Sequence, residues 1–281
     1  MRQQLFGLFA DLAAARPDLP VEDVYSGRFA SLYDTGDSAR LGDVPQVSAV
    51  ADLLSSHLQR PLHILELGCG SGRLLLPLAE RGHEVTGIDR STTMLRLARS
   101  RLAAAPTGTR ELVTLRRDDM SEFELPKRFD LILLPINNVA LLPNVEARQR
   151  TFAGAAAHLA EAGVFLVDHL LPGREVRGDR DVRAHVDLDE NGHERLVLTG
   201  QRFEPASDAL LLNVFVQTRG CDPDQEWWIG TSRKQLIDPQ DLRRELDASG
   251  FVVVRSVRRR LRGPLGEPLH FELLVTGSAP T

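Results

Sequence analysis

Apolar residues recur along the chain at two different spacings, and the change between them divides the sequence. Before residue 60, apolar positions three and four residues apart predict helices over 5–12 and 44–58. The segment between them, VYSGRFASLYDTGDS (24–38), is rich in turn formers and predicts a loop with short helical pieces. We therefore expect residues 1–60 to form an N-terminal helical lid.

From residue 63 onward, short apolar runs alternate with stretches of helical spacing. Strands that are apolar on both faces and separated by helices indicate a parallel sheet covered on both sides. Residues 61–179 are therefore expected to form an α/β core with a Rossmann-like, doubly wound sheet. The predicted strands are 63–67, 84–89, 112–118, 129–135 and 163–170, with helices after the first two strands and near 146–161.

Residues 180–237 follow a third pattern. Four strand-like runs are joined by short polar turns, which is typical of antiparallel hairpins. Asp238 and Pro239 then begin a helix that Gly250 ends, and two further strands follow. The sequence therefore predicts an antiparallel β-insertion after the fifth strand and a return to the α/β core over 238–281.

Composition and charge exclude several classes of protein. The 281 residues are 42% hydrophobic and 26% charged, as in ordinary globular proteins, and the net charge of −5 argues against a general polyanion binder. No apolar run approaches the length of a membrane span and the N-terminus has no signal-peptide pattern, so we expect a cytoplasmic protein. Two cysteines, Cys69 and Cys221, are too few for a disulfide framework or a zinc site.

The segment ILELGCGSGRL (64–74) carries the candidate chemistry. A strand turns into a helix through glycines at 68, 70 and 72, and glycine is needed where a backbone turns tightly against a ligand. Such a turn can also use glycine for packing alone. The second strand ends in Asp89, at about the position where nucleotide-binding folds place an acid on the ribose hydroxyls.

This block resembles motif I of class I S-adenosylmethionine-dependent methyltransferases. The E-L-G-C-G-x-G-R string, the VTGID strand (85–89) and an Asp-Met pair after the third strand occur together and in order. The resemblance extends over about 63–172 and implies a mostly parallel seven-stranded sheet. The alternative, a nicotinamide-binding domain, would need G-x-G-x-x-G, but position 73 is arginine and no glycine completes the motif.

The resemblance implies a site for S-adenosylmethionine, which leaves as S-adenosylhomocysteine. Gly68 and Gly70 would let the backbone pass the methionine part, whose ammonium would face Glu66. Asp89 would accept hydrogen bonds from the ribose diol. The other implied contacts are Arg90 and Met94 beside the adenine, Asp119 at its amino group, the Met120 backbone at the ring, and Pro135, Ile136 and Asn137 at the sulfonium.

The ends of the fourth and fifth strands bear on the class of methyl acceptor. LPINNV (134–139) lacks the Asn/Asp-Pro-Pro-aromatic string of enzymes that methylate nucleobase amines. Asp168 is followed by His169, not by the asparagine of magnesium-dependent catechol-type enzymes. The resemblance therefore implies neither a nucleobase acceptor nor a metal.

The β-insertion, the entry segment YSGRFASLYD (25–34) and the closing helix resemble those of bacterial small-molecule methyltransferases, such as glycine/sarcosine and aminosugar N-methyltransferases. In that group the insertion roofs the pocket or forms a dimer contact, and a tyrosine closes over the cofactor. Tyr25 and Tyr33 are the candidates here, although each could simply pack a helical lid. Leu141 stands where aminosugar enzymes carry a histidine, which weakens the case for an aminosugar acceptor.

His169 is the favoured group for handling a proton in catalysis. It ends the fifth strand, and ligands of parallel sheets lie beyond the carboxyl ends of the strands. His185 and Asp187 in the insertion are alternatives, and a histidine that only forms a structural hydrogen bond is another.

Two further features could serve a substrate. Trp227 and Trp228 are adjacent, so on a strand they face opposite sides and at most one can line a pocket. The arginines at 255, 258, 259, 260 and 262 could bind RNA, but no aromatic residues are interleaved with them. We therefore interpret this run as a solvated edge strand protected by its charges.

Together with these features, the resemblance implies a bacterial methyltransferase of secondary metabolism that acts on a small molecule, and it is the resemblance that favours N-methylation. Methylation at carbon or oxygen of an aromatic or indole natural product, or of RNA, is the alternative. The expected partners are the small-molecule substrate and a second copy bound through the β-insertion, with no nucleic acid and no membrane.

Overall fold

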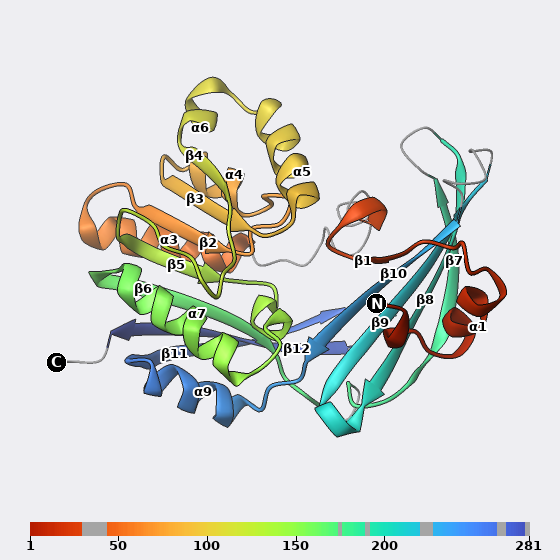
Figure 1. The fold of residues 1–281 in the computed structure, drawn as a ribbon. Coiled ribbons are helices and arrows are strands. Elements are labelled where there is room, and N and C mark those ends of the chain that lie inside the picture. Colours follow the sequence, from red (N-terminus) through yellow and green to blue (C-terminus); the bar gives the residue numbers. More distant parts are fainter. Residues whose placement is uncertain (30–43, 174–175, 189–191, 220–226, 263–267, 279–281) are drawn as a thin grey trace.

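Two β-sheets make up most of the chain, and Figure 1 shows them next to each other. The structure is a computed structural model that describes residues 1–29, 44–173, 176–188, 192–219, 227–262 and 268–278. Within these ranges, none of the helices combines the length and the apolar character needed to cross a membrane. We refer to the seven-stranded sheet as the core sheet and to the five-stranded one as the second sheet.

The core sheet has the strand order β11-β12-β6-β5-β2-β3-β4. Its first five strands along the chain are parallel, and β12 is antiparallel to both β6 and β11. The α/β class predicted from the alternating pattern is therefore confirmed. The strands are β2 (His63–Leu67), β3 (Glu84–Asp89), β4 (Val113–Arg117), β5 (Phe129–Leu134), β6 (Leu159–Leu170), β11 (Phe251–Arg262) and β12 (Pro268–Ser278).

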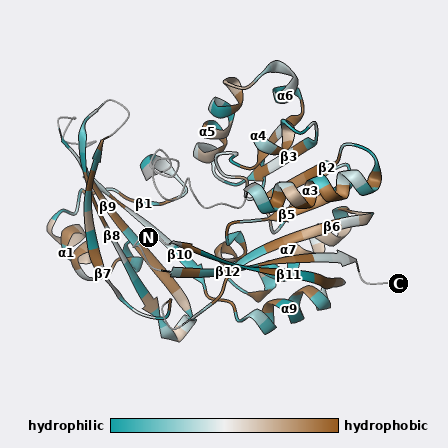
Figure 2. Cartoon of the chain, turned by 180° about the vertical axis from the view of Figure 1, so that it is seen from behind, coloured by the Kyte–Doolittle hydropathy of each residue, from teal (hydrophilic) through white to brown (hydrophobic). Residues whose placement is uncertain are grey.

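Helices cover both faces of the core sheet because its central strands are apolar on both sides. On one face, α7 (Val145–His158) and α9 (Pro239–Ala248) pack through residues such as Phe152 and Leu246. On the other face lie α3 (Val44–Leu58), α4 (Leu75–Ala79) and α5 (Thr92–Ala103), with the short α6 (Thr107–Glu111) leading into β4. Figure 2 shows brown, hydrophobic stretches along the strands and teal stretches on helices such as α9.

The second sheet has the order β1-β10-β9-β8-β7. Four of its strands are the predicted insertion, β7 (Arg180–Leu188), β8 (Glu194–Glu204), β9 (Ala209–Thr218) and β10 (Trp227–Gln235), and successive ones pair antiparallel. Short 3-10 turns accompany it: η1 (Arg2–Gln4), η2 (Gly27–Phe29) and η5 (Pro205–Ser207). The fifth strand, β1 (Val21–Asp23), pairs parallel with β10 although the sequence predicted a loop nearby.

The first sixty residues are shared between the two sheets. Helix α1 (Gly7–Ala15) packs on the second sheet, where Phe9 is buried in one cluster with Phe215 and Ile229, whereas α3 packs on the core sheet. In between, β1 and η2 lead toward the carboxyl end of β3 (Figure 1). The lid predicted over residues 1–60 stays a prediction.

The helix predicted near 146–161 ends earlier, because α7 stops at His158 and β6 begins at Leu159. The His158 ring is held on both sides: its Nδ1 lies 2.7 Å from the Gly154 carbonyl oxygen, and its Nε2 accepts the Leu125 N–H. Leu159 is extended and pairs with Phe129 of β5. Strand pairing therefore overrides the helical spacing of the last three residues.

The arginine run on β11 is only partly solvated, which corrects its interpretation as a wholly solvated edge strand. The Arg258 side chain is 77% exposed, but the Arg259 side chain is only 7% exposed and donates to Asp168 over 2.8 Å. Successive residues of a strand face opposite sides, and the side of Arg259 is the one that packs against the end of β6. The sequence prediction missed Asp168 as the partner that draws this arginine inward.

A second buried ionic cluster lies on the opposite side of the core sheet, around Glu272 of β12. His169 Nε2 lies 3.4 Å from Glu272 Oε2, Arg243 Nη2 of α9 lies 3.0 Å from the same oxygen, and Arg258 lies 3.6 Å from Oε1. Glu272 and His169 are both at most 2% exposed. The hydrogen bond from His169 has the largest effect on the Glu272 carboxyl, burial opposes it and Arg243 adds to it, so that its pKa is lowered to about 2.

Because the folded protein lowers this pKa from 4.5 to about 2, the carboxylate stabilises the fold fully above pH 4.5 and loses this contribution as the pH falls toward 2. Between pH 4.5 and 2 the unfolding free energy of the wild type should fall as the pH falls. We expect Glu272→Gln to make this slope shallower by up to about 1.4 kcal/mol per pH unit. Guanidinium denaturation at several pH values measures this slope, with Glu80→Gln, at an exposed position, as the control. Equal slopes for wild type and Glu272→Gln would contradict the assignment.

Candidate functional site

The glycine-rich loop after β2 has a backbone conformation that residues with a side chain rarely adopt. Gly68 and Gly70 have φ angles of +71° and +53°, in the left-handed region that glycine adopts readily. A Cβ on Gly68 would lie 2.7 Å from Nδ2 of Asn138, so a side chain would collide there. A Cβ on Gly70 would meet nothing within 4 Å, which means that the loop borders open space at this point.

Asp89 ends β3 directly beside this loop. Its Oδ2 accepts the Gly70 N–H and its Oδ1 accepts the Ser91 N–H, both over 2.8 Å. Burial raises the pKa of the Asp89 carboxyl above its ordinary value, and the two N–H donors oppose this effect. Each carboxylate oxygen can accept more than one hydrogen bond, so Asp89 can hold the loop and still bind a diol.

Two buried residues, Glu66 and Cys69, lie at the start of the loop. Glu66, at the end of β2, is 2% exposed. Burial, followed by the charges of Glu66 and Asp89, raises the pKa of the Cys69 thiol far above its ordinary value. Cys69 therefore stays protonated and is unsuited to act as a nucleophile.

The residues after β4 form a third side of the region around the glycine-rich loop. The Asp118 N–H donates to the Asp89 carbonyl over 3.2 Å, which joins the ends of β4 and β3. Asp119 Oδ1 accepts both the N–H and the hydroxyl of Ser121 at 2.8 Å. Burial alone would raise the pKa of Asp119, but these hydrogen bonds and the nearby Arg90 lower it, so the carboxylate is kept ionised.

Ser91 links the end of β3 to the entry segment. Its Oγ caps α5 by accepting the Met94 N–H over 3.2 Å, and its hydroxyl donates to the Tyr25 carbonyl. Met94 is buried, whereas Arg90 is exposed at the rim. The structure thus brings the predicted residues Asp89, Arg90, Met94 and Tyr25 to one region.

Groups of both sheets act on the Tyr25 phenol. Burial has the largest effect in raising its pKa, followed by the charge of Asp23; the Ser232 hydroxyl of the second sheet lowers it, and Asp89 and Arg73 also act on it. The Tyr25 N–H donates to Asp23 Oδ1 over 2.8 Å, which fixes the backbone after β1. One predicted tyrosine is therefore close to Asp89, and the other, Tyr33, lies outside the described residues.

The turn after β5 contains two consecutive left-handed residues, Ile136 (φ +55°) and Asn137 (φ +59°). Asn137 Oδ1 accepts the Leu170 N–H at the end of β6 over 3.0 Å, and the residue is buried. Its amide oxygen is thus bonded to the carboxyl end of β6, and its predicted place beside the sulfonium stays a prediction. Pro135 before it is also buried.

Asn138 is the residue of this region that sequence reasoning missed. Its side-chain amide donates to the carbonyls of Leu67 and Gly68, over 3.1 and 2.8 Å. The two adjacent asparagines after an apolar strand are a usable signal, because asparagine tolerates left-handed backbone and carries both a donor and an acceptor.

The remaining candidates lie elsewhere. The His169 ring is buried against Glu272 on the α9 side of the sheet, so its predicted role as a base stays untested. His185 is exposed on β7, and both carboxylate oxygens of Asp187 accept from Arg195 on the neighbouring strand.

The paired tryptophans face opposite sides of β10, as expected. Trp227 packs against Phe215 at a ring distance of 5.8 Å on the α1 side, with Arg16 over its ring. Trp228 is buried among Val214 and Val216 on the other side, which it shares with Ser232. Of the pair, Trp228 is the one on the Tyr25 side.

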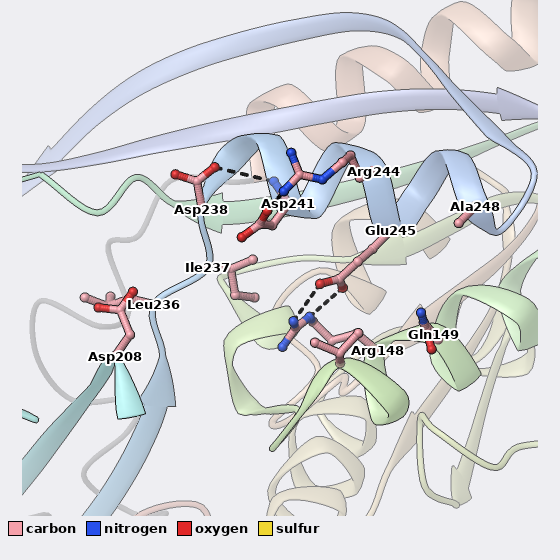
Figure 3. A pocket seen from close by; sticks show the side chains of 11 residues that line it. Arg148, Gln149, Asp208, Leu236, Ile237, Asp238, Asp241, Arg244, Glu245 and Ala248 are labelled. Atoms are coloured by element: carbon pink, nitrogen blue, oxygen red, sulfur yellow. Dashed lines mark hydrogen bonds and ion pairs between the residues drawn. The ribbon is translucent and has the colours of Figure 1, made fainter. Parts of the chain in front are cut away.

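A cavity of about 410 Å³ lies apart from the glycine loop, between α7 and α9. Figure 3 shows Arg148 of α7 directed at Glu245 of α9, with two nitrogen–oxygen distances of 2.7 Å. Its other lining side chains include Asp238, which caps α9. The described parts of the chain contain no group of three His, Cys, Asp or Glu side chains placed to hold a metal ion.

The geometry around the loop fits S-adenosylmethionine. A Cβ at Gly70 would fill the space that borders the loop, and the Asp89 carboxylate beside it offers acceptors for a ribose diol. Glu66 places a buried carboxyl group at the other end of the loop, where it could pair with a ligand ammonium.

Comparison with known proteins finds matches to methyltransferases. Residues 64–163 match the model of a methyltransferase domain. The chain is 29% identical over 146 residues to dTDP-3-amino-3,4,6-trideoxy-alpha-D-glucopyranose N,N-dimethyltransferase of Streptomyces venezuelae, a match of 52% of this chain and 58% of that protein. The chain thus spans a little over half the length of this curated relative.

Solved structures share the fold over more of the chain. The CcbJ methyltransferase of Streptomyces caelestis superimposes with a TM-score of 0.71 at 24% identity, covering 92% of this chain and 99% of that one. The glycopeptide N-methyltransferase MtfA in complex with S-adenosylmethionine gives a TM-score of 0.55 at 25% identity, covering 83% and 94%. Residues 64–163 therefore match a methyltransferase domain, and one solved structure that shares the fold holds S-adenosylmethionine.

Proposed function

We propose that the chain is an N-methyltransferase that moves a methyl group from S-adenosylmethionine to an amine of a small molecule. The observation that carries this proposal is the hydrogen bond between Gly70 and Asp89, with Tyr25 tied to the same region because Ser91 hydrogen-bonds both Asp89 and the Tyr25 carbonyl. The relatives support the amine, since those named above are an aminosugar N,N-dimethyltransferase and a glycopeptide N-methyltransferase.

In such a reaction the protein has to align the acceptor amine with the methyl group of the cofactor and exclude water from both. The sulfonium of the cofactor supplies an electrophilic methyl group when it is bound. Asp89 and the glycine loop would fix the nucleoside and methionine parts, and alignment of reacting groups can supply about 7–11 kcal/mol of the barrier. With its pKa raised by burial, Tyr25 stays protonated and would act as a hydrogen-bonding cover that excludes water, not as a base.

The second sheet would form the wall on the acceptor side. Ser232 lies beside the Tyr25 phenol, and Trp228 lies on the same face of β10, so this face presents both an apolar and a polar part. His169 is buried in its ionic cluster, and we propose that it stiffens the carboxyl end of β6. An amine that arrives unprotonated needs no base on the protein.

Methyl transfer to a carbon or oxygen of an aromatic natural product is the second candidate, and Trp228 is the feature that favours it. RNA is disfavoured, because Arg259, one of the basic residues of β11, is already committed to Asp168. In a screen of aminosugar nucleotides, glycopeptide amines, amino acids, phenols, indoles and tRNA, we expect methylation of an amine with release of S-adenosylhomocysteine. Turnover of phenols, indoles or tRNA alone would overturn the N-methyl proposal.

Loss of the Asp89 carboxylate should abolish most of the cofactor affinity. Asp89→Ala removes both an acceptor for the ribose and the anchor of the Gly70 N–H, so we expect the Kd for S-adenosylmethionine to rise at least about tenfold in calorimetry. Asp11→Ala, at an exposed position on α1, is the matched control and should bind as wild type does. Equal affinity in Asp89→Ala would remove its assigned role.

We also propose that two copies pair through β7, the edge strand of the second sheet. One face of β7 is apolar and open, with Val182, Val186 and Leu188 exposed to 38%, 65% and 63%. Within the described residues, β7 pairs with β8 alone. An antiparallel two-fold pairing centred on residue 185 would set Val182 against the partner's Leu188 and Arg183 against the partner's Asp187, so the strand is complementary to itself.

Val186→Asp should separate the two copies without unfolding either, because this side chain is already exposed in one chain. Light scattering with size-exclusion chromatography measures the mass, and we expect a dimer for wild type and a monomer for the variant. Val254→Asp, at a valine of β11 that is 67% exposed, is the matched control and should stay dimeric. A monomeric wild type, or a dimer that survives Val186→Asp, would refute the pairing.

A further inference from the structure

We propose that Asn138 is a positioning residue for the cofactor: its side-chain amide holds the Leu67 and Gly68 carbonyls and thereby sets the shape of the glycine-rich loop. The inference rests on the S-adenosylmethionine site described above. Asn138 lies at the start of η4 (Asn138–Leu141), on a different strand connection from the loop that it holds.

The contacts of Asn138 span two neighbouring parallel strands. Its Nδ2 donates over 3.1 and 2.8 Å to the carbonyls of Leu67 and Gly68, while its own backbone N–H donates to the Pro135 carbonyl over 3.0 Å. One end of the residue is thus anchored in the β5 turn, and the other end reaches the last residue of β2 and the first glycine of the loop.

The turn that presents Asn138 is itself strained and tied down. Ile136 and Asn137 both have left-handed φ angles, which is uncommon for a β-branched residue such as isoleucine. The side chain of Asn137 accepts the Leu170 N–H of β6. Strained backbone persists when surrounding contacts overdetermine it, and such turns concentrate at functional sites.

The loop is therefore held from two sides. On the β3 side, the Ile88 carbonyl accepts the N–H groups of Gly68 and Cys69 at 2.9 Å, and Asp89 accepts that of Gly70. On the β5 side, the described contacts to the loop's first carbonyls come from Asn138. Removing the amide would leave the Gly68 carbonyl free to turn, and with it the Gly70 backbone that borders the ligand space.

The residue types at positions 68 and 138 are matched to each other. A side chain on Gly68 would meet Nδ2 of Asn138 at 2.7 Å, so the asparagine itself requires glycine there. An aspartate at 138 would place carboxylate oxygens against two carbonyl oxygens, which repel it. Asparagine combines the donor with the length that reaches both carbonyls.

The main test compares Asn138→Ala with Asn144→Ala. Asn144 caps α7 by accepting the Ala147 N–H over 2.9 Å, so its loss destabilises the fold away from the loop. We expect Asn138→Ala to raise the Kd for S-adenosylhomocysteine at least about tenfold in calorimetry, and Asn138→Asp to raise it further. Asn144→Ala should lower Tm and leave the Kd within about twofold of wild type.

A second readout needs no ligand. In hydrogen exchange of the protein alone, Asn138→Ala should speed exchange of the Gly70 amide, whereas Asn144→Ala should not. If Asn138→Ala does not fold, Asn138→Ser, which retains a shorter donor, should show the same two changes to a smaller extent.

A double-mutant cycle tests the contact with Gly68 directly. Gly68→Ala should weaken binding in the wild-type background, and it should cost less in the Asn138→Ala background because the collision with Nδ2 is gone. Unchanged Kd and unchanged exchange in Asn138→Ala, with wild type binding normally, would overturn the positioning role alone. A wild type that does not bind S-adenosylhomocysteine would instead overturn the proposed function.

Discussion

The site depends on one interaction, the hydrogen bond from the Gly70 N–H to the Asp89 carboxylate. It joins the loop after β2 to the end of β3, and it holds a partly buried negative charge next to backbone that only glycine adopts readily. The carboxylate is costly to bury, and the two N–H donors that offset this cost also orient it. The same group is thus a structural anchor for the loop and the acceptor available to a ribose diol.

The other elements converge on that carboxylate. The residues after β4 are tied to the Asp89 backbone through Asp118, and the cap of α5 is tied to Tyr25 through Ser91. Tyr25 comes from β1, which extends the second sheet, so this sheet reaches the cofactor region through the chain as well as through Ser232. This connection ties the insertion to the proposed site, because β1, the strand that leads into Tyr25, pairs with β10.

Local patterns in the sequence were sufficient to predict the core strands and the antiparallel strands of the second sheet, because alternating apolar runs and short polar turns are themselves local. The residues assigned to the cofactor stay predictions, although the structure brings several of them together around Asp89. The misses involve partners distant in the chain. Strand β1 is only three residues long, too short for a periodic pattern, and its structure is decided by its pairing with β10. Arg259 is drawn inward by Asp168, and Asn137 and Asn138 find their partners on β6 and in the glycine loop. None of these contacts leaves a periodic trace in the sequence.

The central claim is that the glycine loop, Asp89 and Tyr25 form one cofactor site covered by the second sheet. A crystal structure of the chain with S-adenosylhomocysteine tests it most directly. The account predicts the ribose hydroxyls within hydrogen-bond distance of Asp89, the ligand backbone against Gly70, and the Tyr25 phenol over the nucleoside. A ligand bound elsewhere, for example in the cavity between α7 and α9, or a Tyr25 turned away from it, would contradict the account.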